Sequence, residues 1–75
     1  MTDSKILEDD RMVHKANQIA GYFEAYPNED KAVDGVADHI QKFWSPPMRK
    51  QLKEYIANGG PDLHDLVIRA ANKHL

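Results

Sequence analysis

The stretch VDGVADHIQKFWSPPMRKQL, residues 33–52, decides the fold, because it predicts the end of one helix, a proline corner and the start of another helix. Apolar residues recur in it at steps of three and four and so share one helical face: Val33, Val36, Ala37, Ile40 and Trp44. Ser45, Pro46 and Pro47 end the first helix, because a residue before proline leaves the helical region and proline donates no hydrogen bond. Pro47 suits a first helical position, so we expect the next helix to begin there.

Two helices are predicted up to this corner, over residues 10–25 and 29–44. The first has an apolar stripe made by Met12, Ala16, Ile19, Ala20, Phe23 and Tyr26, with Val13 at its border. We expect Asp9 or Asp10 to cap it and Pro27 to end it. Asn28 is expected to cap the second helix. Residues 1–8 are expected to form a frayed lead-in, in which Ile6 and Leu7 can fold back as a hydrophobic staple.

The second predicted helix has two features of composition. Glu29, Asp30 and Asp34 are explained by the preference for negative charge near a helix N-terminus. Gly35 costs about 1 kcal/mol relative to alanine in a helix interior. It marks either the close approach of another helix or an unimportant exposed position.

Two more helices are predicted after the corner, over residues 47–58 and 63–73. The third helix has Met48, Leu52, Tyr55 and Ile56 on one face, and Arg49, Lys50, Lys53 and Glu54 on the other. Gly59, Gly60 and Pro61 form a strong helix stop, and we expect Asp62 to cap the fourth helix. The inward residues of the fourth helix are Leu63, Leu66, Val67, Ala70 and Ala71. We therefore predict an all-α single domain over residues 1–75, built as a compact bundle or array of four short helices with antiparallel neighbours.

The composition is that of a small soluble domain. The chain has 75 residues, of which 41% are hydrophobic and 29% charged. Its net charge of −2 argues against a dedicated nucleic-acid binder, which normally has a basic excess. The lack of cysteine removes disulfides and thiolate metal sites and is compatible with the cytoplasm. No apolar run approaches the roughly 20 residues of a membrane span.

The aromatic residues at the corner have two interpretations. In the first, Trp44 is the keystone of the core together with Ile40, Phe23 and Leu52. In the second, Phe43 and the two prolines form a rigid anchor for a protein partner, because aromatic residues dominate interface hot spots. Both can hold, since Trp44 can face inward while Phe43 faces outward.

The sequence offers little for catalysis or metal binding. Its histidines are His14, His39, His64 and His74, and no pair has the i,i+4 spacing of a helical metal site. No catalytic triad pattern and no phosphate-binding glycine loop after a strand is present. We therefore predict no catalytic, cofactor-binding or metal residues. Four cations around the corner form a local basic patch: Lys42, Arg49, Lys50 and Lys53. It is explained by a solvated face or by an acidic partner, and less well by nucleic acid.

Two blocks of the sequence resemble the delta subunit of NAD-dependent, molybdenum-containing formate dehydrogenases. The first is the run from Ala16 to Ala20, followed by the aromatic pair Tyr22 and Phe23. The second is VADHI at residues 36–40, continued by Lys42-Phe43-Trp44 and Pro47-Met48-Arg49. The tail pattern of the family is matched by Gly59, Gly60, Leu63, Leu66, Val67 and Ala70. The resemblance covers residues 11–71 and departs at residues 45–47, where the family more often has an acidic residue and a single proline.

The resemblance implies a small, cofactor-free accessory chain of a cytoplasmic complex, in which larger subunits hold the molybdenum pterin, the iron-sulfur clusters, the flavin and the NAD site. We therefore expect a non-catalytic subunit that binds the larger subunits and helps to assemble or stabilise the complex. The expected partner contacts are Tyr22, Tyr26, Phe43, Pro46, Pro47 and Arg49. The alternative is a small regulatory or adaptor domain that uses its basic patch on an acidic protein surface or on nucleic acid.

Overall fold

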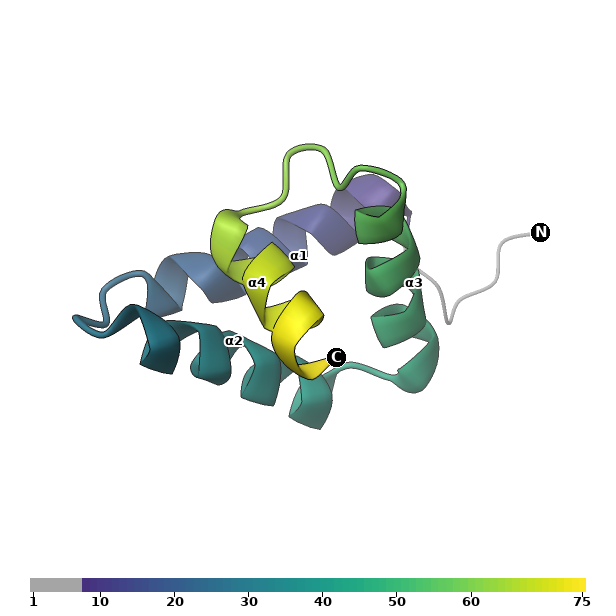
Figure 1. Cartoon of the computed structure of the whole chain (residues 1–75). Helices are drawn as coiled ribbons and strands as arrows, with labels where there is room; N and C mark the ends of the chain where they lie inside the picture. Colours follow the sequence, from purple (N-terminus) through teal and green to yellow (C-terminus); the bar gives the residue numbers. More distant parts are fainter. Residues whose placement is uncertain (1–7) are drawn as a thin grey trace.

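Four α-helices make up the fold of this chain in a computed structural model that describes residues 8–75 (Figure 1). They are α1 (Asp9–Phe23), α2 (Glu29–Phe43), α3 (Pro46–Ala57) and α4 (Asp65–His74). No strand occurs in this range. The predicted all-α fold is therefore confirmed, and the predicted staple of Ile6 and Leu7 lies outside the described residues.

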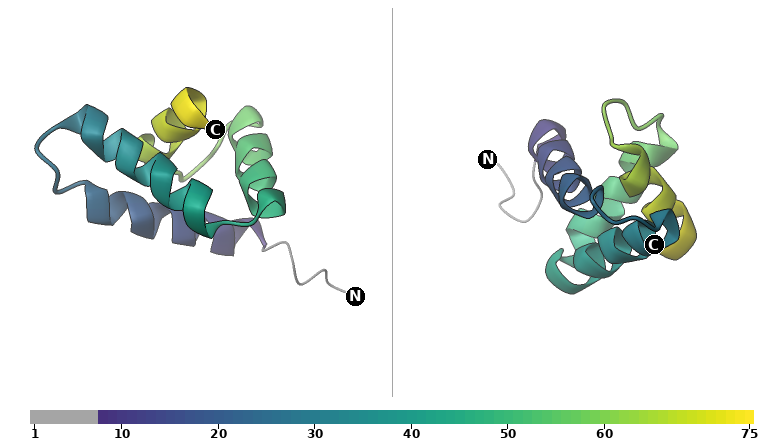
Figure 2. Two further views of the ribbon diagram at one scale, coloured as in Figure 1. Left: turned by 90° about the horizontal axis from the view of Figure 1, so that it is seen from below. Right: turned by 90° about the vertical axis from the view of Figure 1, so that its left-hand side faces the viewer.

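The helices form an array around a shared core. Antiparallel helices α1 and α2 form a hairpin, and α3 stands steeply across them near the end of α2 (Figure 2). The most extensive contact joins α2 to α4, which are not consecutive. These two helices run in the same general direction, since Glu29 pairs with Arg69 and, further along both helices, Gln41 bonds to the carbonyl of His74. The expectation of antiparallel neighbours therefore holds for α1 and α2, but the helices in most extensive contact run in the same direction.

The core is made by the inward faces of all four helices, as the helical periodicity predicted, except that Tyr26 lies beyond the end of α1 and is exposed. Trp44, Ile40 and Leu52 are buried, and Phe23 is half-buried against the core. No polar side chain is buried among the described residues. The remaining buried hydrophobic residues are Met12, Val13, Ala16, Ala20, Ala32, Val33, Val36, Ala37, Leu66, Val67, Ala70 and Ala71.

The corner between α2 and α3 differs in detail from the prediction. Trp44 is extended and ends α2, and the Ser45 Oγ caps α3 by accepting from the Met48 N–H at 3.4 Å. The third helix therefore begins at Pro46 rather than Pro47, because the first turn of a helix needs no N–H donors. The Arg49 Nη1 donates to the carbonyls of Gln41 at 3.1 Å and Trp44 at 2.9 Å. Arg49 thus folds back to satisfy the end of α2, whereas the sequence placed it on an outward face.

The predicted N-cap of α1 is wrong, and the predicted N-cap of α2 is confirmed. Glu8, not Asp9 or Asp10, is the N-cap residue of α1, and it makes no side-chain cap bond. Both aspartates lie in the first turn, where their charge still suits the helix dipole. The Asn28 cap of α2 is confirmed, since its Oδ1 accepts from the Lys31 N–H at 3.0 Å.

The turn after α3 confirms the predicted glycine cap. Gly59 and Gly60 both have positive φ, at 114° and 55°, which suits glycine. Their N–H groups donate to the carbonyls of Ile56 and Tyr55, at 3.0 and 2.9 Å. This pair of bonds is the Schellman arrangement that ends a helix.

The start of α4 contradicts the prediction. Asp62 has a φ of 66°, and the helix begins at Asp65 behind His64, whose Nδ1 accepts from the Leu66 N–H at 3.1 Å. The amide of Asn17 in α1 explains this shift. It donates to the Asp62 carbonyl at 2.9 Å and accepts from the His64 N–H at 2.8 Å. The loop is therefore held in place by Asn17 of α1, and His64 rather than Asp62 caps the helix.

Candidate functional site

A groove of about 800 Å³ runs between α1 and α2 and ends at the corner. We call it the aromatic groove, because four of its lining side chains are Tyr22, Phe23, Phe43 and Trp44. The other lining residues are Lys15, Gln18, Ile19, His39 and Met48.

Helical spacing brings these side chains together. On α1, Lys15, Ile19 and Tyr22 follow at steps of four and three and so form one stripe along the groove. On α2, His39 and Phe43 are four residues apart, and their rings lie 4.7 Å from centre to centre. The two helices run antiparallel (Figure 2). The groove therefore has one edge from each helix.

The edges of the groove are exposed, whereas its floor belongs to the core. Tyr22 is 71% exposed and Phe43 is 73% exposed, which makes this an open groove rather than a closed pocket. Trp44, the next residue in the chain, is only 7% exposed, because it leaves the helix in an extended conformation and points inward. Exposed apolar patches are typical of interaction surfaces, and aromatic residues are enriched in such surfaces. The expected division between an inward Trp44 and an outward Phe43 is confirmed.

Ring contacts hold the edge of α1 in place. Phe23 packs between Tyr22 and Tyr26, with ring centres 5.0 and 5.2 Å apart. The ring of Phe23 also lies against Gly35 of α2, where a Cβ atom would be well inside van der Waals contact. Of the two interpretations of this glycine, close approach is therefore the correct one, and the approaching group is a side chain. The contacts reduce the entropy that these rings lose when a partner docks.

The six expected partner contacts do not form one site. The aromatic groove contains Tyr22 and Phe43. Tyr26, which is 43% exposed, lies beyond Phe23 and outside the lining of the groove. Pro46 and Pro47 are exposed at the corner, and Arg49 is half-buried by its bonds to α2.

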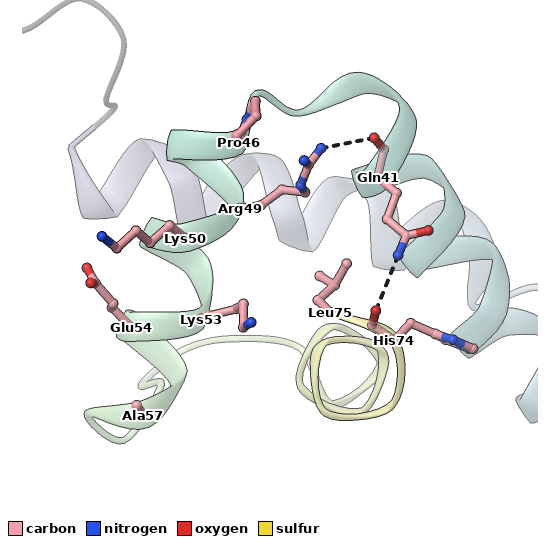
Figure 3. Close-up of a pocket in the computed structure, with 9 residues that line it drawn as sticks. All are labelled: Gln41, Pro46, Arg49, Lys50, Lys53, Glu54, Ala57, His74 and Leu75. Carbon is pink, nitrogen blue, oxygen red and sulfur yellow. Dashed lines mark hydrogen bonds between the residues drawn. The ribbon is translucent and has the colours of Figure 1, made fainter.

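A second groove, of about 700 Å³, lies between the end of α2, α3 and the end of α4 (Figure 3). Arg49 and Gln41 cross it through their bonds to main-chain carbonyls, and the Gln41 Nε2 donates to the His74 carbonyl at 3.2 Å. Lys50 and Lys53 line one side, together with Glu54. The predicted basic patch is therefore smaller than its four cations suggest. Arg49 is engaged, and Lys42 pairs with Asp38 at 3.2 Å.

Two histidines have roles that the sequence did not reveal. The His64 Nε2 lies 2.9 Å from a carboxylate oxygen of Glu24, and the His74 Nε2 lies 2.6 Å from the Asp34 Oδ1. Hydrogen bonds from His74 and then Lys73 lower the pKa of Asp34 below its usual value. Asp34 therefore binds the end of α4, and the explanation of its charge by the start of α2 was incomplete. No local spacing signals these pairs, because the partners are about 40 residues apart.

No group of three or more histidine, cysteine, aspartate or glutamate side chains in residues 8–75 is placed to hold a metal ion. Within the same range no helix is long and apolar enough to cross a membrane.

A family model described as "NADH-dependant formate dehydrogenase delta subunit FdsD" matches residues 11–71. The match extends from the first turn of α1 into α4 and includes every residue that lines the aromatic groove. It spans the same residues as the resemblance found in the sequence. Neither a curated protein nor a solved structure matches the chain.

Proposed function

We propose a function for this chain on the premise that it belongs to the family of delta subunits of NADH-dependent formate dehydrogenases. It acts as a non-catalytic accessory subunit of a cytoplasmic formate dehydrogenase complex. It binds the larger subunits and helps to assemble or stabilise them. A chain that binds only the mature conformation of a partner stabilises that conformation by mass action.

The observation that supports this proposal is the pair of exposed aromatic side chains at the edges of the groove. Tyr22 and Phe43 are the most exposed large apolar side chains of residues 8–75, although these residues form a shared core. Such surface is stabilised when a partner covers it, and aromatic anchors contribute strongly to binding. A docking role explains their exposure, whereas a role confined to the folding of this chain does not.

The test is co-expression of the tagged chain with the larger subunits, followed by purification under mild conditions. We expect the larger subunits to be retained, and we expect the complex to lose formate-dependent NAD⁺ reduction at a lower temperature when the chain is omitted. Recovery of the chain only as a free monomer contradicts the proposal. Turnover of formate by the isolated chain contradicts its non-catalytic part.

The alternative is an adaptor domain that binds an acidic protein surface or nucleic acid through the basic patch. The structure leaves this patch with Lys50 and Lys53, because Lys42 is paired and Arg49 is bonded to the end of α2. Binding through exposed lysines weakens steeply with salt, whereas apolar docking does not. Strong, salt-sensitive binding to DNA, RNA or an acidic protein, with no retention of the dehydrogenase subunits, favours this alternative.

A further inference from the structure

We propose that the aromatic groove binds an amphipathic α-helix of a larger subunit, with apolar side chains between Tyr22 and Phe43 and a carboxylate facing Lys15. This inference rests on the proposed function and adds to it the place and the chemistry of the contact. It follows from the shape of the groove, its apolar lining and the sign of its charge.

The shape favours a helix. The groove lies between two antiparallel helices, and on α1 it extends from Lys15 to Tyr22. Seven residues of helix span about 10 Å, or two turns, at 1.5 Å per residue. A helix of similar direction presents anchors at i, i+3 or i+4, and i+7 over the same length, which is the usual way in which a helix fills a groove. A peptide that binds by adding a strand needs the edge of a sheet, and residues 8–75 contain no strand.

The lining favours apolar anchors along the length of the groove. Phe43 and Met48 lie at its corner end, and Tyr22 and Phe23 lie toward its other end, where the ring of Phe23 packs against Gly35. Ile19, Phe23 and Met48 are half-buried, so apolar side chains at helical spacing cover this lining and exclude water from it. Hot spots of binding have this arrangement.

The charge favours an acidic residue on the helix. Apart from His39, Lys15 is the only basic residue that lines this groove, and no carboxylate lines it. A carboxylate opposite Lys15 complements this charge and sets the direction of the docked helix. A symmetric pair of copies of this chain would bring together two surfaces with the same lysine and no carboxylate, so the groove is poorly suited to self-association.

The inference is tested by purifying the complex of larger subunits with variants of this chain. We expect Phe43→Ala and Tyr22→Ala each to weaken retention at least about tenfold, as is typical of aromatic hot spots. Lys15→Glu is expected to weaken it severalfold, because it opposes the carboxylate. Far-UV circular dichroism of each isolated variant should match the wild type, since these side chains lie outside the core.

A control variant locates the contact. Lys53→Glu makes the same charge reversal as Lys15→Glu, but beside the second groove. We expect Lys53→Glu to be retained like the wild type. If it weakens retention as much as Lys15→Glu does, the contact lies elsewhere and the inference is wrong. If the wild type itself is not retained, the proposed function fails instead.

A photo-reactive phenylalanine derivative in place of Gln18, which lines the groove between Lys15 and Tyr22, identifies the occupant. We expect cross-links to one helical segment of a larger subunit, with apolar residues at helical spacing and an aspartate or glutamate within two turns. A cross-link to a second copy of this chain overturns the inference. So does a cross-link to a non-helical segment or to a helix without acidic residues.

Discussion

The two sides of α2 bury apolar surface in different ways. On one side, α4 covers the helix, and polar pairs surround the contact: Glu29 with Arg69 at 2.8 Å, and Asp34 with Lys73 and His74 at 3.3 and 2.6 Å. On the other side, α1 covers only part of the helix, and the aromatic groove stays open with Phe43 at its edge. No ion pair of the described residues involves the lining of the groove.

The difference shows which apolar surface the fold of this small domain leaves uncovered. On the covered side, small residues such as Ala37, Ala70 and Ala71 are buried, and flexible polar side chains surround them. On the open side, large rigid rings remain in water although the chain has apolar residues enough to fill a core. The covered side accounts for the fold, and the open side is the surface that we propose for docking.

Trp44 and Phe43, which are neighbours at the corner, should show this contrast most strongly. We expect Trp44→Ala to lower the free energy of unfolding by about 3–5 kcal/mol, because it removes a buried aromatic side chain from the core. This is a large part of the roughly 4–11 kcal/mol available to a chain of this size. Phe43→Ala should change it by less than about 0.5 kcal/mol. Urea unfolding followed by circular dichroism measures both.

Similar losses in the two variants would show that Phe43 supports the fold, and the distinction between the two sides would then be lost. Little loss in Trp44→Ala would remove Trp44 from the core. Phe43→Leu serves as a control, since it keeps apolar volume at the edge without an aromatic ring.

The loop that leads into α4 is held in place by the side chain of Asn17. We expect Asn17→Ala to lower the free energy of unfolding by about 1–2 kcal/mol, because it leaves the Asp62 carbonyl and the half-buried His64 N–H without their partner. Gln18→Ala is the matched control, since Gln18 is exposed, and its effect should stay within about 0.5 kcal/mol. Equal effects of the two changes would contradict the role given to Asn17.

Substitutions of Gly35 and Gly21 test how closely side chains pack against these two glycines. Gly35→Ala should lower the free energy of unfolding by about 1 kcal/mol, since displacing the Phe23 ring outweighs the gain in helix propensity. Gly21→Ala has nothing within 4 Å of its new methyl group and should stabilise the chain by about 0.5–1 kcal/mol. Thermal unfolding of both variants measures the difference. Stabilisation by both changes would show that Phe23 moves aside at little cost.

The smallest expected effect is the pH dependence of the unfolding free energy that arises from Asp34 on the covered side. Because the pKa of Asp34 is lowered in the folded chain, its pairs contribute stability that is present above the usual carboxyl value of 3.8. That contribution is lost as the pH falls through the lowered pKa. We expect the unfolding free energy of the wild type to fall more steeply than that of Asp34→Asn between about pH 5 and pH 2. Parallel curves for the two proteins would contradict this.

Local sequence determined much of the fold. The apolar periods of residues 33–44 and 63–71 predicted the buried faces, and Pro46, Gly59 and Gly60 marked helix ends at or next to the observed ones. The errors occurred where a distant residue intervenes. Asn17 moves the start of α4 past Asp62, and Arg49 turns from solvent to the end of α2.

Sequence alone determined the four helices, the inward Trp44 and the family, because helix formation and its signals act over a few residues and a family pattern is a linear pattern. Only the tertiary structure decided that α4 lies along α2, that Asp34 meets His74, and that Tyr22 and Phe43 border one groove. These contacts join residues about 20–40 positions apart in the chain. Their positions depend on how whole helices pack, and no local spacing records that arrangement.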